Sequence, residues 1–377
     1  MAIPLTLAVV GLLASVVVPQ AYCKYGCPTG ALFKFVRSAN QAETWGRRDT
    51  WAAVILAVGA VVAFLPRPEF AAEETPETAA RHAVTELHGA AFGTTWTVKV
   101  RGSDLDAQIL KRELEAEINR IEFSLSHWRE SSATTDFNRL ESAQPFGITQ
   151  ELADMVEFTL RLSAASDGMY DITVAPLTSL WGYGPAGKLP DPTPEQLKAA
   201  LTKVGWQKLK LDKENLTLAK SHEGVNLDLG SVLQGYAADR AAGILRALGQ
   251  TDFLVEVGGE ILASGSWRVG IEDPFNPRVM IRTVLLTDRA LSPSGLYRAK
   301  RLAAGKPVSH ILSPKTGRPV EPTLEMVVVY HDSCFQADGW ATALMAVGFE
   351  QAKVIAQREQ LDVMLVTPDK QVWQSRK

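Results

Sequence analysis

One short stretch combines the residue types that a phosphate-binding turn requires. The sequence NLDLGSVLQGYAADRA, residues 226–241, places Asp228, Gly230 and Gly235 just before a helix that is predicted to open at Tyr236. Glycines let the backbone approach a ligand closely, and the free N–H groups at a helix start suit a phosphate. A plain strand-to-helix connection has the same composition, so both interpretations stay open at this point.

A second stretch offers ligands for a hard metal ion. In QADGWATALMAVG, residues 336–348, Asp338 and Thr342 are four positions apart and therefore share one face of a helix. A carboxylate and a hydroxyl are oxygen ligands of the kind that magnesium accepts. The spacing alone favours a structural role, in which Asp338 is the N-cap of the helix and Thr342 bonds to its own backbone.

Helices and strands alternate from about Leu87 onward, and these elements must position the two stretches. An amphipathic helix is predicted over 105–126, where Leu114, Ile118 and Ile121 recur with helical spacing. Gly258 predicts a tight turn between two strands. Further helices are predicted over 151–165, 236–249 and 338–348, and strands over 93–102, 252–265, 267–273, 283–287 and 326–331. The pattern predicts an α+β fold with one compact domain over 87–377.

Composition limits the function classes. The chain has 377 residues, of which 46% are hydrophobic and 21% are charged, so it is long enough for one large or two medium domains. Its net charge of −3 provides no basic excess to neutralise phosphates, which argues against a nucleic-acid partner.

Two uncharged runs near the N-terminus predict a membrane anchor over 1–66. No charged side chain occurs from Met1 to Cys23 or from Thr50 to Pro66, and each run is near the lower limit of about 17–25 residues for a membrane-spanning helix. We therefore predict transmembrane helices at about 2–21 and 50–66, followed by a Pro-, Ala- and Glu-rich linker over 67–86. The alternative, a signal peptide followed by a core helix, is less favoured because 1–20 contains no lysine or arginine.

The charges around these runs predict the topology. The connecting loop carries Lys24, Lys34, Arg37, Arg47 and Arg48, whereas the segment after the second run is rich in glutamate. The positive-inside rule places this basic loop in the cytoplasm and both termini outside. In a bacterium, the chain would cross the inner membrane twice, with its large domain in the periplasm.

The cysteines occur mainly in the anchor, and only Cys334 lies in the large domain. The run YCKYGCPTGALF, with Cys23 and Cys27, resembles the cysteine region of membrane ferredoxins of the NosR and NapH type, including the regulators that accompany nitrous oxide reductase. A four-iron cluster needs four thiolates, and this run offers two. A redox centre completed by a partner and a remnant with inert thiols both remain open.

Eight landmarks follow one another from about His88 to the C-terminus. They are FGTTWTV, FSLSHWRESSATTDFNRL, YDITVAPLTSLWGYGP, NLDLGSVLQGYAADRA, VEVGGEILASGSWRVGIEDP, LSPSGLY, VSHILSPKTGRPV and FQADGWATALMAVG. In type and order these landmarks resemble the FAD:protein FMN transferases, the ApbE-type flavin transferases. The resemblance covers nearly all of this part of the chain, and the cysteine run indicates the branch associated with nitrous oxide respiration (NosX-like).

This resemblance implies roles for individual residues. Asp338 and Thr342 match the metal-binding positions of the family, and Ser231 matches a backbone ligand of the same Mg²⁺. The positions that match FAD contacts are Phe92, Trp181, Gly182, Tyr183, Asp228 and Gln234.

The resemblance also implies the reaction. A threonine or serine hydroxyl of an acceptor protein attacks the FMN phosphorus of FAD, AMP leaves, and His310 accepts the hydroxyl proton. The expected acceptor is an exported electron-transfer protein with such a hydroxyl, for example an FMN-binding protein of the NosR type. Two alternatives are an FAD pyrophosphatase, in which water replaces the hydroxyl, and an FAD-binding electron-transfer subunit of the membrane.

Three positions depart from the family pattern. Gln234 stands where many members have lysine, Leu296 replaces a polar residue of the motif that ends at Tyr297, and Ala341 replaces a carboxylate that some members carry beside the metal. These changes predict weaker FAD binding or slower transfer, but they leave Asp338 and Thr342 intact.

Overall fold

A computed structural model describes residues 83–102, 104–141, 143–187, 189–296, 301–303 and 306–375 of the chain. These residues all belong to one compact unit, Glu74–Lys377. The two predicted membrane helices, their basic loop and the cysteine run lie outside the described residues. Within the described part, no helix has both the length and the apolar character needed to cross a bilayer.

An antiparallel sheet of eight strands forms the centre of the fold, in the order β1-β2-β6-β7-β10-β13-β14-β15. Its strands are β1 (Val84–Ala91), β2 (Thr94–Arg101), β6 (Phe253–Val257), β7 (Glu260–Ser264), β10 (Ala290–Gly295), β13 (Met326–His331), β14 (Asp362–Val366) and β15 (Val372–Gln374). β1 begins inside the stretch 67–86 that was predicted as linker, because Val84 pairs with Arg101 of β2.

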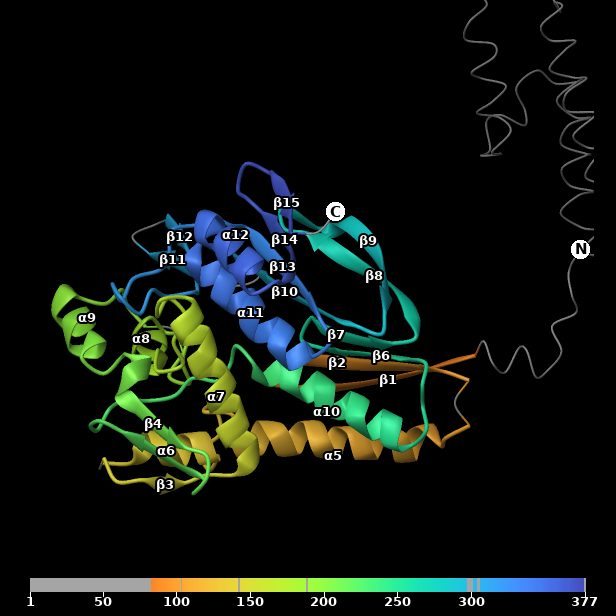
Figure 1. Cartoon of the computed structure of the whole chain (residues 1–377), viewed down its shortest axis with the longest axis horizontal. Helices are drawn as coiled ribbons and strands as arrows, with labels where there is room; N and C mark the ends of the chain where they lie inside the picture. The colour runs from red at the N-terminus through yellow and green to blue at the C-terminus, as the bar shows by residue number, and fades with distance from the viewer. Residues whose placement is uncertain are drawn as a thin grey trace, which may run out of the picture. The chain divides into compact units, whose positions relative to one another are not determined.

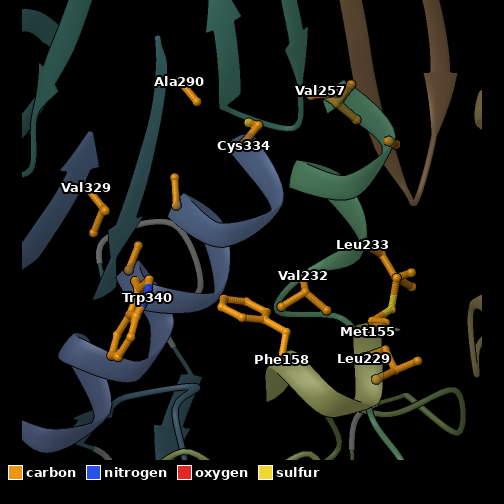
Figure 2. Packing of buried hydrophobic residues seen from close by; sticks show 14 of the residues in the cluster. Met155, Phe158, Leu229, Val232, Leu233, Val257, Ala290, Val329, Cys334 and Trp340 are labelled. Carbon is orange, nitrogen blue, oxygen red and sulfur yellow. The ribbon is translucent and has the colours of Figure 1, made fainter. Parts of the chain in front are cut away.

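Four helices pack on one face of this sheet (Figure 1). They are α5 (Ala107–Leu125), α10 (Leu233–Ala247), α11 (Cys334–Val347) and α12 (Phe349–Arg358). A further helix, α7 (Gln150–Ala165), packs against α11 and β4. α10 lies over β6 and β7, α11 lies over β10 and β13, and the two helices are neighbours. Figure 2 shows Phe158 of α7 between Val232, at the start of α10, and Trp340 of α11.

The opposite face of the sheet is covered by a hairpin of β8 (Ser266–Asp273) and β9 (Asn276–Thr287). The side chains of β13 pack into both cores, one on each face of the sheet. Its Val327 and Val329 join the core beneath the helices, whereas Met326 and Val328 join the core beneath the hairpin. Because both faces are covered, β13 is apolar throughout its buried length and does not alternate with polar residues.

Smaller elements complete the domain beside the helical layer. They are α6 (Ala133–Arg139), α8 (Ala175–Leu180), α9 (Pro194–Leu201), a 3₁₀ turn η2 (Trp206–Lys208), a three-stranded sheet of β3 (Phe146–Gly147), β5 (Thr217–Lys220) and β4 (Leu209–Asp212), and the pair β11 (Arg301–Ala303) and β12 (Lys306–Val308).

The α+β prediction is confirmed, and the long amphipathic helix appears as α5, whose N-cap Asp106 accepts bonds from two backbone N–H groups. The predicted helix ends at 249 and 348 are also confirmed, since α10 ends at Ala247 and α11 at Val347. Gly249 and Gly348, which follow these ends, have positive φ of 77° and 78°. Two helix starts were predicted too late. α10 begins at Leu233 and α11 at Cys334, because tertiary contacts support an additional turn at each start.

Candidate active site

The turn before α10 is held rigidly by its neighbours. The Asn138 side chain accepts a hydrogen bond from the Leu227 N–H at 2.6 Å and donates one to the Leu227 carbonyl at 2.9 Å. Leu227 and Leu229 are fully buried, so the residues that alternate with them, Asp228 and Gly230, face away from the core. Because buried leucines alternate with Asp228 and Gly230, the Asp228 side chain lies outside the core, shortly before α10 begins.

Neutral donors fix the Asp228 carboxylate in place. Its Oδ1 accepts the Gly230 N–H at 3.0 Å, and its Oδ2 accepts the Thr178 hydroxyl at 3.1 Å. His127 Nδ1 lies 3.5 Å from Oδ1, and the His127 side chain is only 7% exposed. Sequence reasoning missed Thr178 and His127 as neighbours of Asp228. Their only signal was that each falls inside a family landmark.

Ser231 and Gln234 lie on the same approach to α10. The Ser231 hydroxyl is 2.8 Å from the Tyr170 hydroxyl, and burial raises the pKa of Tyr170 well above its usual value, so this phenol stays protonated. Gln234 packs against the turn between β6 and β7, because a Cβ added at Gly258 would lie 2.8 Å from the Gln234 side chain. Gly258 has φ of 66° and forms the tight hairpin turn that the sequence predicted.

Asp338 lies inside α11 and is not its N-cap, so that structural interpretation was wrong. The N-cap is Ser333, whose hydroxyl accepts the Gln336 N–H. Asp338 is 5% exposed, and its Oδ2 accepts the Gly235 N–H of α10 at 3.0 Å. Burial raises the pKa of Asp338 to about 8, although the bond from Gly235 lowers it.

These features meet the requirements of a hard divalent cation. Within the described residues, no basic side chain forms an ion pair with Asp338, so the ionised carboxylate lacks a compensating charge. The Thr342 hydroxyl follows one turn later, 3.5 Å from the Ser294 hydroxyl of β10. Among the described residues, no group of three or more His, Cys, Asp or Glu side chains could hold a metal ion. The side chains of Asp338 and Thr342 offer oxygen atoms, which are the ligands that magnesium accepts.

Two of the three departures have structural explanations. Ala341 of α11 is fully buried in the main core, where a carboxylate would face apolar neighbours. Leu296 is 7% exposed and belongs to the same core. Both positions are therefore part of the packing beneath α11.

The residues predicted to meet the flavin follow α8. The Trp181 indole is 5% exposed, and its Nε1 donates to the Gly317 carbonyl at 2.7 Å. This places the indole in a small core with Leu177 and Leu197, while Gly182 continues the chain with φ of 72°. Trp181 thus contributes to the loop's position mainly through packing.

His310 lies beside this loop. Its ring centroid is 6.4 Å from that of Tyr183 in an edge-on arrangement, and the Tyr183 hydroxyl is 3.5 Å from the Ser309 carbonyl. His310 Nδ1 is enclosed and has no hydrogen-bond partner among the described residues. Burial lowers the pKa of His310 below its usual value. A neutral imidazole with an available nitrogen is suited to accept a proton.

Phe92 occupies the turn between β1 and β2, with φ of 54°, and its side chain packs against the main core. The turn between β6 and β7 lies at the same end of the sheet, since Gly258 N–H donates to the Thr95 carbonyl at 3.0 Å. Phe92 and Gln234 are thereby brought to one end of the sheet. Thr178 of α8 bonds to Asp228, which connects the segment that leads to Tyr183 with the turn before α10.

Comparison with known proteins places this geometry in a family. The profile of the ApbE family matches residues 92–365, which contain the Asp228 turn, His310 and the Asp338 helix. The chain belongs to the ApbE family. The FAD:protein FMN transferase of Salmonella typhimurium is 36% identical over 306 residues, with 78% of this chain and 87% of the relative covered. The enzyme of the same name from Escherichia coli K12 is 34% identical, with 79% and 88% covered.

Solved structures agree with this membership in the ApbE family. The flavin transferase ApbE from Vibrio cholerae superposes with a TM-score of 0.70 at 30% identity, covering 78% of this chain and 97% of that one. The apo form of the Pseudomonas stutzeri flavinyl transferase ApbE also has a TM-score of 0.70, at 32% identity, with 78% and 96% covered. The likeness therefore extends over nearly the whole of each solved domain.

The close approach of α10 and α11 yields a first prediction. A Cβ added at Gly235 would lie 2.4 Å from the Cys334 carbonyl oxygen and 2.7 Å from Asp338 Cβ. We expect Gly235→Ala to force the helices apart and to lower the free energy of unfolding by about 1–3 kcal/mol. Thermal unfolding followed by circular dichroism measures this loss.

Gly243→Ala is the matched control, because Gly243 is on the same helix and an added Cβ there meets no atom within 4 Å. Alanine favours a helix over glycine by roughly 0.5–1 kcal/mol, so this variant is expected to be as stable as the parent or more so. If both variants had the same melting temperature, α10 and α11 would not be in the contact described.

Proposed function

We propose that this chain transfers FMN from FAD to a threonine or serine hydroxyl of an acceptor protein and releases AMP. The observation that carries the proposal is the pair of oxygen ligands Asp338 and Thr342 on α11 in a member of the ApbE family, with Asp338 bonded to the Gly235 N–H at the start of α10. In the reaction, a bond forms between the acceptor oxygen and the FMN phosphorus, and the bond from that phosphorus to the bridging oxygen breaks. AMP leaves with the bridging oxygen. The direct test is whether an acceptor gains the mass of FAD less AMP, which is the mass of FMN less one water.

Magnesium would be held by Asp338, Thr342 and the backbone oxygen of Ser231, and it would neutralise charge on the pyrophosphate. The chain's own residues supply the positioning. Hydrogen bonds from Thr178 and Gly230 fix Asp228 in the turn before α10, where its carboxylate is suited to accept hydrogen bonds from FAD. Gln234 would contact FAD from the first turn of α10. Because phosphoryl transfer leaves little covalent work to the protein, this positioning accounts for most of the acceleration.

His310 would accept the proton of the attacking hydroxyl. Burial lowers its pKa, so the ring is neutral at pH 7, and its Nδ1 has no competing partner among the described residues. Tyr183 would hold the flavin half of FAD near this ring, because the Tyr183 ring lies edge-on to His310. Trp181 would support the same loop through its buried indole.

We further propose that the domain works in the periplasm, anchored to the inner membrane by residues 1–66, and that its acceptor is an exported electron-transfer protein. The support is the charge asymmetry around the two uncharged runs and the resemblance of YCKYGCPTGALF to membrane ferredoxins. All of these residues lie outside the described part of the chain.

A reporter fusion tests this topology. A reporter that is active only in the periplasm, fused after Lys377, is expected to be active in the full chain. The control is the same reporter fused within the basic loop, after Arg37, where it is expected to be inactive. The reverse pair of results would place the domain in the cytoplasm and contradict the proposal.

A further inference from the structure

α10 contacts α11 at two points that are one helical turn apart. Gly235 and Asp239 are four residues apart and thus share one face of α10. Gly235 donates its N–H to Asp338, and Asp239 reaches the start of α11. The partners on α11, Cys334 and Asp338, are also four residues apart. One face of α10 therefore contacts successive turns of the helix that carries Asp338 and Thr342.

Asp239 makes three hydrogen bonds to the start of α11. Its Oδ1 accepts the Cys334 N–H at 2.8 Å, and its Oδ2 accepts the Phe335 N–H at 3.1 Å and the Ser333 hydroxyl at 2.7 Å. All three partners donate, so the carboxylate form is the one that satisfies them. A charged acceptor at a helix N-terminus is also favoured by the helix dipole.

Capping the N-terminus of α11 does not by itself require the bonds from Asp239. Ser333 already caps α11 in the ordinary way, since its hydroxyl accepts the Gln336 N–H at 3.3 Å. Asp239 adds acceptors from a different helix, and the backbones meet so closely that a Cβ at Gly235 would overlap the Cys334 carbonyl. With both contacts in place, α11 has little freedom to rotate or slide along α10.

We propose that Asp239 is a positioning residue for the metal site, which acts by fixing the rotation and translation of α11. Rotation or sliding of α11 would move Asp338 and Thr342 together relative to Ser231, which lies before α10. The inference rests on the proposed function, because it assumes that these oxygens hold a divalent cation.

The test compares metal binding in three variants of the full chain in detergent, with FAD present. Mn²⁺ serves as the probe because it takes the same oxygen ligands as Mg²⁺, and free Mn²⁺ is measured by electron paramagnetic resonance. Asp239→Asn keeps the shape but places an amide N–H against donors, and we expect the Mn²⁺ dissociation constant to rise about 10-fold. Asp239→Glu keeps the charge but lengthens the link to α11, so it is also expected to weaken binding.

Ser333→Ala is the matched control. It removes the ordinary cap and one of the three bonds to Asp239, but it leaves both backbone contacts of Asp239 in place. We expect a lower melting temperature with a Mn²⁺ dissociation constant within about twofold of the parent, because losing a cap costs stability without moving the helix. Saturating Mg²⁺ is expected to restore FMN transfer by Asp239→Asn, since the ligands themselves are intact.

Two results would overturn the inference and leave the proposed function standing. Parental Mn²⁺ affinity in both Asp239 variants would make Asp239 a stabilising cap only. Equal weakening in Ser333→Ala, for the same loss of melting temperature, would attribute the effect to general destabilisation. If the parent chain itself transferred FMN without binding Mn²⁺ or Mg²⁺, the proposed metal role would fail first, and the inference would fail with it.

Discussion

Asp338→Asn is expected to lower the rate of FMN transfer by about 10³-fold at fixed Mg²⁺, because an amide oxygen is a poor substitute for a carboxylate ligand of a divalent cation. The fold should persist. The amide oxygen can still accept the Gly235 N–H, and the variant no longer buries an ionisable group whose pKa burial raises to about 8. We therefore expect the melting temperature to stay the same or to rise.

The measurement pairs initial rates of adduct formation with thermal unfolding of the same preparations. A ligand role predicts loss of rate without loss of stability, whereas a structural role predicts the reverse. Thr342→Val is the companion variant, because it keeps the side-chain shape and removes the hydroxyl; its rate is expected to fall with little change in stability. Full activity of Asp338→Asn would refute the metal assignment.

His310→Gln is expected to slow transfer by about 10²-fold or more, because the acceptor hydroxyl then loses the group that takes its proton. FAD affinity is expected to change much less, since the pyrophosphate and adenine halves are held elsewhere. The informative quantity is the ratio of the loss in kcat to the change in FAD dissociation constant. Equal losses in both would make His310 a binding residue.

The pH profile gives His310 a second, independent test. Burial lowers its pKa below 6.5, so the neutral, proton-accepting form dominates at pH 7. The rate for the parent chain is expected to be level near pH 7 and to fall as the pH drops through the lowered pKa, when the imidazole becomes protonated. His310→Gln is expected to lose this acidic limb. A profile with the same limb in both proteins would assign the titration to another group.

Much of the fold followed from local patterns in the sequence. Leu114, Ile118 and Ile121 line one face of α5 and are fully buried, as their spacing predicted. Gly249 ends its helix as expected because only glycine adopts positive φ there without strain. Asp228, Asp338 and Thr342 were grouped as one site only when the family resemblance was added to spacing, and both the grouping and the individual roles stay predictions.

The features that the sequence did not predict depend on contacts between distant segments. α11 is apolar on nearly all sides, so its pattern has little periodicity, and its start at Cys334 depends on Asp239 of another helix. The pairing of His127 with Asp228 joins residues about a hundred positions apart. Such pairs require the tertiary fold, because neither partner has a local signature.

The most direct test of the central claim is the intact mass of an acceptor. The full chain in detergent is incubated with FAD, Mg²⁺ and an FMN-binding acceptor domain that contains a threonine or serine site. We expect one FMN-sized adduct on the acceptor, formed with an equal amount of AMP and absent when the metal is chelated. AMP and free FMN without an adduct, at the rate seen when no acceptor is present, would contradict FMN transfer and identify an FAD pyrophosphatase.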